Sequence, residues 1–489
     1  MDANDQSTAA DDRMTSVSSR KRSIRERADR QALERERWIS RNTYTYDEHH
    51  RYLRFLIPRG LKVLELGCGI GHTLAALDPR VGVGVDFSDG MVEQAQRRYP
   101  HLQFIVGDVE DPELLSRLDH PFDVILLSDT IGELEDVEST LKNIRQYCVP
   151  DARLIIAYFS NTWEPILSIA EAMGQAMPHG HQNWLSTGDT MGLLNLAGFD
   201  VVKRDWRQLI PKRLLGVGSL LNRYVGTLPL LRRLCLRNYI VARAPEHRRE
   251  ERSVSVVIPC KNERGNVESA VRRLPEFGSH MEVLFVEGGS EDGTREEIQR
   301  VIDEFPERDI KLIAQDGKGK GSAVRTAFEA ASGEILIILD GDLTVPPEWI
   351  RRFYEILRDG RGEFANGTRL VYPMEEQAMR FLNHIANRMF AQLFTWLLNQ
   401  SLSDTLCGTK VLFRRHYERI DAGRSYFGNF DPFGDFDLLF GASKLNLKIV
   451  EVPVRYASRT YGETQISRFQ HGWLLLKMVV FAYRKLKTV

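Results

Sequence analysis

The chain has 489 residues, of which 43% are hydrophobic and 27% are charged, and its formal net charge is −1. This length exceeds what a single hydrophobic core holds, so we expect two or three domains. The near-zero net charge excludes the strongly basic balance of many nucleic-acid-binding proteins, and no nucleic-acid partner is expected. Five cysteines lie far apart without a Cys-x-x-Cys pair. They predict reduced thiols in a cytosolic protein, and neither a disulfide framework nor a zinc site.

Residues 1–20 are polar and lack the apolar segment of a secretory signal. No stretch reaches the roughly 18 apolar residues that crossing a bilayer requires. The longest candidate, residues 472–483, is shorter and contains Lys477. We therefore expect a cytoplasmic protein, either soluble or peripheral on the cytoplasmic face of a membrane.

Three regions follow one another along the chain. Residues 1–40 are expected to be disordered at first and then to form a charged helix with a solvated face. In residues 41–248 short β-rich runs alternate with helix-length segments, and a second alternation fills residues 249–489 after a charged linker. This pattern predicts an α/β fold class with two doubly wound domains, the first of them Rossmann-like.

The first domain contains the segment VLELGCGIG, from Val63 to Gly71. A strand ends near Glu65, and three glycines then allow a tight turn into a helix and a close approach of a ligand to the backbone. The spacing G-x-G-x-G differs from the G-x-G-x-x-G of nicotinamide-binding loops. A nicotinamide-dependent reductase is therefore disfavoured.

Two further acids follow the next two expected strands. Asp86 is placed to accept both hydroxyls of a ribose, and Asp108 to meet an adenine amino group. As a set these residues resemble the class I adenosyl-methionine-dependent methyltransferases, over about residues 40–245. The resemblance implies S-adenosyl-L-methionine as cofactor, bound by Glu65, Gly67, Gly69, Gly71, Asp86, Asp108 and Ser128. A Rossmann-like domain without a ligand is the alternative.

The acceptor of the methyl group is not evident from the sequence. Asp129 and Glu133 follow the fourth expected strand, and His181 is a candidate general base or a structural residue. A domain that binds the cofactor without catalysis stays open.

The second domain carries the sharpest signal of the chain, in the run EILIILDGDLTV. An apolar strand ends in Asp340 and Asp342, separated by one glycine. Two carboxylates this close repel each other unless a cation neutralises them, and a hard divalent cation such as Mg²⁺ or Mn²⁺ can also hold a diphosphate. The alternative is a structural role, in which the two aspartates cap a helix and bind no metal.

These motifs resemble the family 2 glycosyltransferases of GT-A fold, and within them the polyprenyl-phosphate sugar synthases typified by dolichyl-phosphate mannose synthase. The resemblance runs from about Ser253 to the C-terminus and implies an inverting transfer from a nucleotide-diphosphate sugar, with a metal on Asp340 and Asp342. It implies that Arg369 and Arg380 hold an acceptor phosphate, near Asn383. Asp435 or Asp437 is the candidate base if the acceptor is a hydroxyl.

The donor site implied by the resemblance comprises Pro259, Asn262, Glu263, Glu287, Asp292 and Lys320. Lys320 lies in a glycine-rich run at a helix start, which suits a diphosphate. The sequence departs from the family at three places. Gly288 replaces a usual carboxylate beside Glu287, Thr344 follows the metal motif, and Gln465 stands where a lysine is usual. The lipid-phosphate acceptor is therefore one expectation and another glycan acceptor the other.

Two basic apolar segments, residues 209–243 and 473–489, suit either peripheral contact with anionic lipid or packing between domains. The sequence as a whole predicts a bifunctional enzyme, with sugar transfer and methyl transfer in one glycan or glycolipid pathway. The alternative is a glycosyltransferase fused to a non-catalytic regulatory or scaffold domain that binds adenosyl-methionine.

Overall fold

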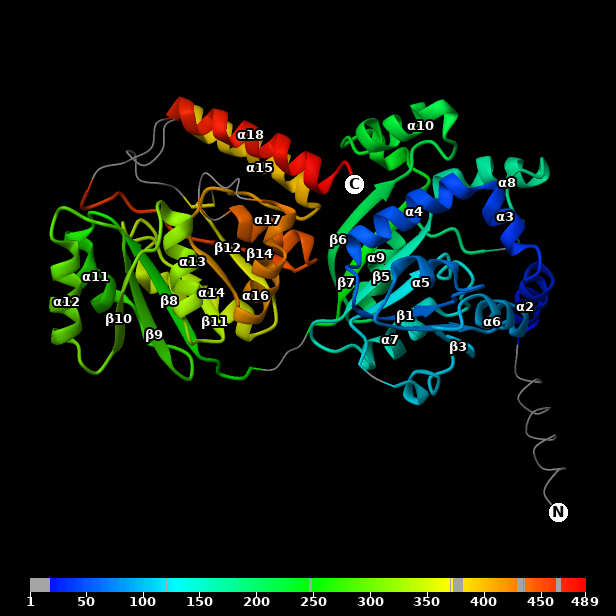
Figure 1. Ribbon diagram of the computed structural model, residues 1–489, viewed down its shortest axis with the longest axis horizontal. Coiled ribbons are helices and arrows are strands. Elements are labelled where there is room, and N and C mark those ends of the chain that lie inside the picture. The colour runs from blue at the N-terminus through cyan, green and yellow to red at the C-terminus, as the bar shows by residue number, and fades with distance from the viewer. Residues whose placement is uncertain are drawn as a thin grey trace, which may run out of the picture. The chain divides into compact units, whose positions relative to one another are not determined.

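The computed structural model divides the chain into two compact units, residues 1–244 with Val489 and residues 245–488 (Figure 1). It describes residues 18–119, 121–178, 180, 182–245, 249–369, 371–372, 381–428, 434, 436–462 and 468–489, with backbone only for 381–385 and 468–471. Both units have an α/β fold, as the sequence predicts.

The sheet of the first unit has the strand order β3-β2-β1-β4-β5-β7-β6. All neighbours pair in parallel except β7, which is antiparallel to both β5 and β6. The strand order reverses between β1 and β4, the place where open α/β sheets bind ligands. The strands are β1 (Lys62–Leu66), β2 (Val81–Asp86), β3 (Gln103–Val106), β4 (Val124–Ser128), β5 (Arg153–Phe159), β6 (Asp200–Arg207) and β7 (Arg237–Arg243).

Helices flank this sheet. Its strands are rich in Val, Leu and Ile because side chains on both faces of the sheet are covered. In β4, for example, the four residues before Ser128 are all apolar and buried. The helices are α2 (Ser19–Gln31), α3 (Arg35–Arg41), α4 (Thr43–Leu56), α5 (His72–Leu77), α6 (Asp89–Arg98), α7 (Val137–Gln146), α8 (Glu164–Ala172), α9 (Thr187–Leu196) and α10 (Val217–Leu220). Between β6 and β7 the chain makes a helical excursion that contains α10 (Figure 1).

The charged N-terminal helix differs from the solvated helix that the sequence predicts. α2 is helical, but Ile24 on it is buried, and Lys21 forms ion pairs with Asp108 and Glu110 on the loop after β3. Asp29 accepts hydrogen bonds from the hydroxyl of Ser88, the N-cap of α6, and from the amide of Gly90 in its first turn. The alternating charges are therefore partners for loops of the sheet, a role that only the tertiary structure reveals.

The sheet of the second unit has the order β10-β9-β8-β11-β13-β12-β14. β8 to β11 are parallel, β13 is antiparallel to β11 and β12, and β12 is parallel to β14. The strands are β8 (Val254–Cys260), β9 (Met281–Glu287), β10 (Asp309–Ala314), β11 (Ile335–Ile338), β12 (Phe364–Thr368), β13 (Lys410–Phe413) and β14 (Ile449–Pro453). The carboxyl ends of β8, β9 and β11 meet at one edge, where the acidic motifs lie.

The helices of this unit are α11 (Arg264–Arg273), α12 (Thr294–Glu304), α13 (Lys320–Ala330), α14 (Ile350–Arg358), α15 (Phe381–Leu398), α16 (Arg414–Ala422), α17 (Phe436–Lys444) and α18 (Arg468–Leu486). The two longest, α15 and α18, lie side by side (Figure 1). None of the helices in the described parts of the chain combines the length and the hydropathy that crossing a bilayer requires.

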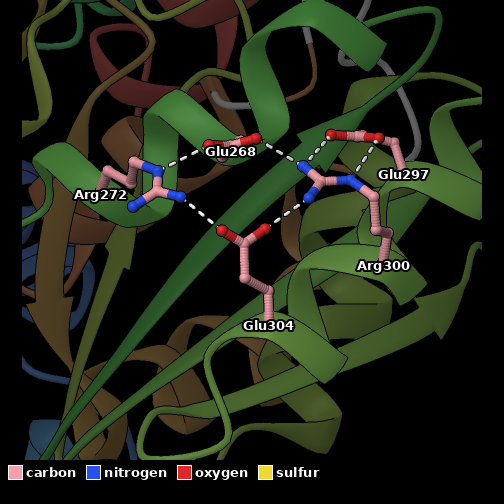
Figure 2. Close-up of polar contacts among 5 residues, drawn as sticks. All are labelled: Glu268, Arg272, Glu297, Arg300 and Glu304. Atoms are coloured by element: carbon pink, nitrogen blue, oxygen red, sulfur yellow. Dashed lines mark hydrogen bonds and ion pairs between the residues drawn. The ribbon is translucent and has the colours of Figure 1, made fainter.

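α11 and α12 lie side by side beside the acidic loops and are joined by a network of charges (Figure 2). Arg300 contacts three carboxylates, those of Glu268, Glu297 and Glu304, and Arg272 bridges Glu268 and Glu304. Because these side chains are half-exposed, each ion pair adds little to the free energy of unfolding. The network instead holds α11 and α12 in position relative to each other. Both helices begin at loops of the site described below.

Candidate active sites

The first unit contains a cavity of about 300 Å³ at the carboxyl ends of β1 to β4. Six of the seven predicted cofactor residues line it: Glu65, Gly67, Gly69, Asp86, Asp108 and Ser128. The seventh, Gly71, does not. Its φ of 73° begins α5, and a Cβ there would lie 2.5 Å from the ring of Phe104. Gly71 is therefore required for packing, whereas Gly69, at φ 52° with nothing within 4 Å of a Cβ, opens on the cavity.

Glu65 is almost fully buried at the end of β1, and its Oε2 has no hydrogen-bond partner in the structure. Burial raises the pKa of this carboxyl well above its usual range, and a backbone hydrogen bond from Leu74 only partly opposes it. A buried acceptor without a donor is costly and points to a missing cationic donor. The ammonium group of an amino-acid moiety fits this requirement.

Asp86 accepts hydrogen bonds from the backbone amides of Gly69, at 2.8 Å, and Ser88, at 3.0 Å. Its position ties the glycine loop to the end of β2 and leaves the carboxylate on the cavity wall. Burial raises its pKa from 3.8 to about 6, against these two hydrogen bonds.

Asp108 is already engaged from two sides. Its Oδ1 accepts from the Glu110 amide and its Oδ2 from the Lys21 ammonium. Each oxygen of Asp108 thus has one partner, and a carboxylate oxygen can accept a second hydrogen bond, such as one from an adenine amino group. The cofactor residues as a group fit adenosyl-methionine, because the orphaned carboxylate, the open glycine and the ribose-directed acid lie in one cavity.

The sequence did not indicate His49, which stands on the cavity wall. Its ring nitrogens lie 2.8 Å from the hydroxyl of Tyr239 and 3.0 Å from that of Ser128. Burial first, and then Arg237 and His50, lower the pKa of His49 well below 6.5, so the imidazole is neutral at pH 7. His49 comes from α4 and Tyr239 from β7, segments without a motif, so only the fold unites them.

The other acids after β4 have partners of their own. Asp129, at φ 60°, is held by both terminal nitrogens of buried Arg237, at 2.7 and 2.9 Å, and Glu133 is held by Arg27 of α2. His181 lies outside the described residues.

Replacing Glu65 by glutamine is expected to weaken adenosyl-methionine binding by about 10- to 100-fold, because a hydrogen bond between charged groups contributes about 1.5–3 kcal/mol. The same change is expected to raise the melting temperature of the unliganded chain, since it removes a buried, unpaired carboxyl. Calorimetry and thermal unfolding measure the two effects. A variant that binds as tightly as the wild type would remove Glu65 from the site.

The pKa of Asp86 predicts a pH dependence of its own. Below pH 6 the carboxyl is protonated, so affinity for adenosyl-methionine is expected to fall by up to about tenfold per pH unit. Stability of the unliganded chain runs the opposite way. A carboxyl whose folded pKa is raised contributes stability below its unfolded pKa of about 4, and that contribution is lost as pH rises towards 6. Titrations of wild type and Asp86→Asn between pH 4 and 8 test both trends, which the variant should lack between pH 4 and 6.

The second unit places Asp340 and Asp342 directly after β11, as the sequence predicts. The Nζ of Lys320, the first residue of α13, lies 2.6 Å from Oδ1 of Asp340. Although burial opposes it, this ammonium lowers the pKa of Asp340. Gly408 packs so closely on this pair that a Cβ there would overlap both charged groups.

Asp342 accepts hydrogen bonds from Thr344, at 2.8 Å from the hydroxyl, and forms an ion pair with Arg459, also at 2.8 Å. Arg459 lies 3.6 Å from Glu263 as well. Burial raises the pKa of Glu263, and Arg459 opposes that rise. Arg459 follows β14 in a segment that the resemblance includes but to which the sequence assigned no role.

The donor set suits a divalent cation. Carboxylate oxygens are hard ligands of the kind that Mg²⁺ and Mn²⁺ prefer. Asp340 pairs with Lys320 and Asp342 pairs with Arg459, so a metal ion at this pair would take the place of one of these two contacts.

The predicted donor-nucleotide residues lie together, but their polar atoms mostly join two loops. Asn262, at φ 58°, donates to Ser290 and accepts from the Glu291 amide. Asp292 accepts from the Arg264 and Thr294 amides and from the Tyr461 hydroxyl. Glu287 is buried and accepts from the Ser290 amide at 2.5 Å. These side chains shape the loops after β8 and β9.

Pro259 stands at the end of β8, where its carbonyl oxygen lies 2.7 Å from the position of a Cβ on Gly341. The glycine between the two aspartates is thus required for close packing on β8. The turn from Asp340 to Asp342 is thus held by Pro259 through this packing and by Lys320 through its ion pair with Asp340.

Two of the predicted acceptor residues, Arg369 and Asp437, form ion pairs within the second unit. Two of the three guanidinium nitrogens of Arg369, Nε and Nη2, donate to the buried carboxylate of Asp404, at 2.6 and 2.9 Å. Asp437 pairs with Arg424 at 3.3 Å. Arg380 and Asp435 lie outside the described residues, as does the side chain of Asn383.

Known protein families match each unit separately. A methyltransferase domain family matches residues 36–204, and glycosyl transferase family 2 matches residues 255–420. The dolichol-phosphate mannosyltransferase of Pyrococcus furiosus is 27% identical over 241 residues, 48% of this chain and 64% of the relative. Glycosyltransferase AglD of Haloferax volcanii is 29% identical over 221 residues, 44% of this chain and 34% of the relative. The chain thus spans less than two thirds of either relative.

Solved structures resemble each unit at low identity. A methyltransferase of Thermotoga maritima, dependent on adenosyl-methionine, shares 21% identity and a TM-score of 0.35, and the match covers 45% of this chain and 99% of that one. Glucosyl-3-phosphoglycerate synthase of Mycobacterium tuberculosis shares 18% identity and a TM-score of 0.35, over 48% and 80%. The chain thus contains one region that matches a methyltransferase domain family and a second region that matches glycosyl transferase family 2.

Proposed function

We propose that the chain is a bifunctional enzyme, which transfers a sugar from a nucleotide-diphosphate donor in its second unit and a methyl group from adenosyl-methionine in its first. The observation that carries the sugar transfer is the pair Asp340 and Asp342, which draws both Lys320 and Arg459 to the end of β11. Such a site suits a diphosphate that must depart with its negative charge neutralised.

In this proposal a divalent ion on Asp340 and Asp342 supplies positive charge to the donor diphosphate. Lys320, at the start of α13, and Arg459, once released from Asp342, neutralise the same leaving group. The acceptor oxygen attacks the anomeric carbon from the opposite face, and the bond to the diphosphate breaks with inversion. A phosphate acceptor needs no base, whereas a hydroxyl acceptor would have to lose its proton to one of the acids of the unit.

The acceptor is proposed to be a polyprenyl phosphate or another glycan. The similarity to a dolichol-phosphate mannosyltransferase supports the lipid phosphate. Peripheral contact of residues 209–243 and 473–489 with the cytoplasmic face of a membrane belongs to the same proposal. On α18 the exposed side chains of Trp473, Leu476 and Val480 suit such a contact.

In the first unit Glu65 would hold the ammonium group, Asp86 the ribose hydroxyls and Asp108 the adenine amino group. Bound adenosyl-methionine supplies an electrophilic methyl carbon on a sulfonium. The acceptor atom forms its bond to this carbon as the carbon–sulfur bond breaks, and the acceptor's proton leaves for a base. His49, whose two ring nitrogens face the hydroxyls of Tyr239 and Ser128, would hold Ser128 on the cavity wall, and solvent water would take that proton.

One assay tests the sugar transfer. The full chain is incubated with nucleotide-diphosphate sugars and polyprenyl phosphate, and release of the nucleoside diphosphate is followed. We expect release that stops on addition of a chelator and resumes with Mn²⁺ or Mg²⁺. Release that continues in the chelator would contradict the metal site.

Calorimetry of the full chain with adenosyl-methionine tests the other unit. Binding is expected. Binding without methyl transfer to any glycan or glycolipid would favour the alternative of a regulatory domain, and absence of binding would contradict both. Mass spectrometry of glycolipids from cells that lack the gene would report missing sugar and missing methyl groups together.

A further inference from the structure

Exposed apolar side chains gather on two segments of the first unit. Of its sixteen exposed large apolar side chains in the described residues, twelve lie on α8 or on the excursion between β6 and β7. Those on α8 and at its C-cap are Ile166, Ile169 and Met173; those on the excursion are Leu214, Leu215, Val217, Leu220, Tyr224, Leu228, Leu230, Leu231 and Leu234. A concentration of this kind marks an interaction surface.

The excursion, residues 209–235, is a built structure. Buried Asn222 clamps its base by two hydrogen bonds with the backbone of Ile210, at 2.8 and 2.9 Å. Gly218 lies against the carbonyl of Lys212, where a Cβ would not fit. The indole of Trp163, just before α8, donates to the carbonyl of Leu234 and so links the two segments.

The tip of this excursion presents leucines in an unusual backbone conformation. Leu214 and Leu215 have φ values of 45° and 53°, followed by Gly216 at 97°. Left-handed conformations are unfavourable for leucine, and Leu215 is fully exposed. In water neither the backbone strain nor the exposure of the two leucines is compensated. Insertion of the two side chains into an apolar phase removes the unfavourable exposure.

The positive charge of the excursion indicates what kind of surface it binds. Residues 209–243 contain no acidic residue. Lys212, Arg213, Arg223 and Arg233 are exposed on the same excursion as the leucines. Basic side chains that flank protruding apolar ones complement an anionic lipid surface, in which the leucines enter the acyl boundary and the cations meet phosphate groups.

The same two segments border the cofactor cavity. Ile166, Leu167 and Ala170 of α8 line it, and so do Pro211 and Lys212 at the start of the excursion. Ile166 is at once half-exposed to solvent and part of the cavity wall. The aromatic side chains of Phe159, Trp163 and Trp184 continue this wall inward. The apolar surface is therefore continuous with the route to the methyl donor.

We infer that α8 and residues 209–235 dock the first unit on an anionic bilayer, and that its methyl acceptor is a lipid whose head group enters the cavity from that bilayer. The docking specifies the membrane contact proposed above for residues 209–243, and the acceptor class rests on the proposed methyl transfer.

The test reports on the tip itself, because α18 could hold the full chain on vesicles by another surface. Leu215→Cys carries an environment-sensitive fluorophore, and Leu196→Cys, an exposed leucine on α9, carries the same label as control. The native cysteines are buried or half-buried, and labelled wild type serves as blank. Vesicles of phosphatidylcholine, with or without phosphatidylglycerol, are added to the full chain.

We expect a blue shift and about a threefold or greater rise in emission at position 215 with the anionic vesicles only, and none at position 196. Arg213→Glu combined with Arg233→Glu should abolish the change, whereas Arg59→Glu, at an exposed arginine elsewhere, should not. An unchanged spectrum at position 215 would overturn the docking, and so would an equal change with neutral vesicles.

Radiolabelled adenosyl-methionine then tests the acceptor class with vesicles made from a lipid extract of the source cells. Label is expected in the organic phase, reduced several-fold by Leu214→Ser with Leu215→Ser. If the chain binds adenosyl-methionine but labels only water-soluble glycans or added protein, the lipid acceptor is wrong and the proposed function stands. If adenosyl-methionine does not bind, the proposed function itself fails.

Discussion

Replacing Asp342 by alanine is expected to lower the rate of sugar transfer by about 10³-fold or more, because a metal ion and a charged side chain both depend on this carboxylate. Asp342 holds Arg459 and Thr344, so its loss removes the proposed metal ligand and also the contact that holds the segment after β14. Release of the nucleoside diphosphate at saturating donor measures the effect.

The matched control is Asp303→Ala, which removes an exposed acid from α12 and leaves the site intact. It should keep the wild-type rate. Titration with Mn²⁺ gives a second readout, since the Asp342 variant should require more metal for any residual activity. Unchanged release in the Asp342 variant would show that the metal and the diphosphate are held elsewhere.

Replacing Gly408 by alanine is expected to lower sugar transfer by about 100-fold, although residue 408 carries no functional group. A Cβ at this position would overlap Oδ2 of Asp340 and Nζ of Lys320, so the ion pair must separate or tilt. A displacement of this kind at a reacting centre costs about two orders of magnitude in rate. The metal requirement should rise with the loss of rate, because Asp340 is displaced from its partner in the metal site.

Gly423→Ala serves as the control, since a Cβ at the end of α16 would make only ordinary contacts, the nearest at 3.4 Å. Circular dichroism should show both variants folded. If Gly408→Ala kept the wild-type rate and metal requirement, the close packing of residue 408 on Asp340 would have no part in the activity.

The sequence alone was sufficient for the parts of both sites that follow a strand directly. Glu65, Asp86 and Asp340 each end a recognisable apolar run, and in a parallel sheet the ends of neighbouring runs meet at one edge. The two α/β units, the methyltransferase resemblance and the glycosyltransferase resemblance could therefore be predicted from local pattern. Six of seven predicted cofactor residues line one cavity for the same reason.

The tertiary structure decided which partner each charged side chain has, because ion pairs join residues that the sequence keeps far apart. Arg369 pairs with Asp404, Arg459 with Asp342, and Lys21 with Asp108. No local pattern distinguishes an arginine that binds a phosphate from one that is held by an aspartate.

The same limit explains why neither the position of His49 nor the exposure of Leu214 and Leu215 could be predicted from the sequence. The sequence showed basic and apolar residues in 209–243 but could not tell buried from exposed ones, because burial depends on how the excursion folds on Asn222 and not on composition. The sequence by itself thus indicated the two family resemblances and the strand ends that carry their predicted residues. Only the fold determined which side chains remain available for substrates, since each polar or apolar group first meets whatever the packing of the chain brings beside it.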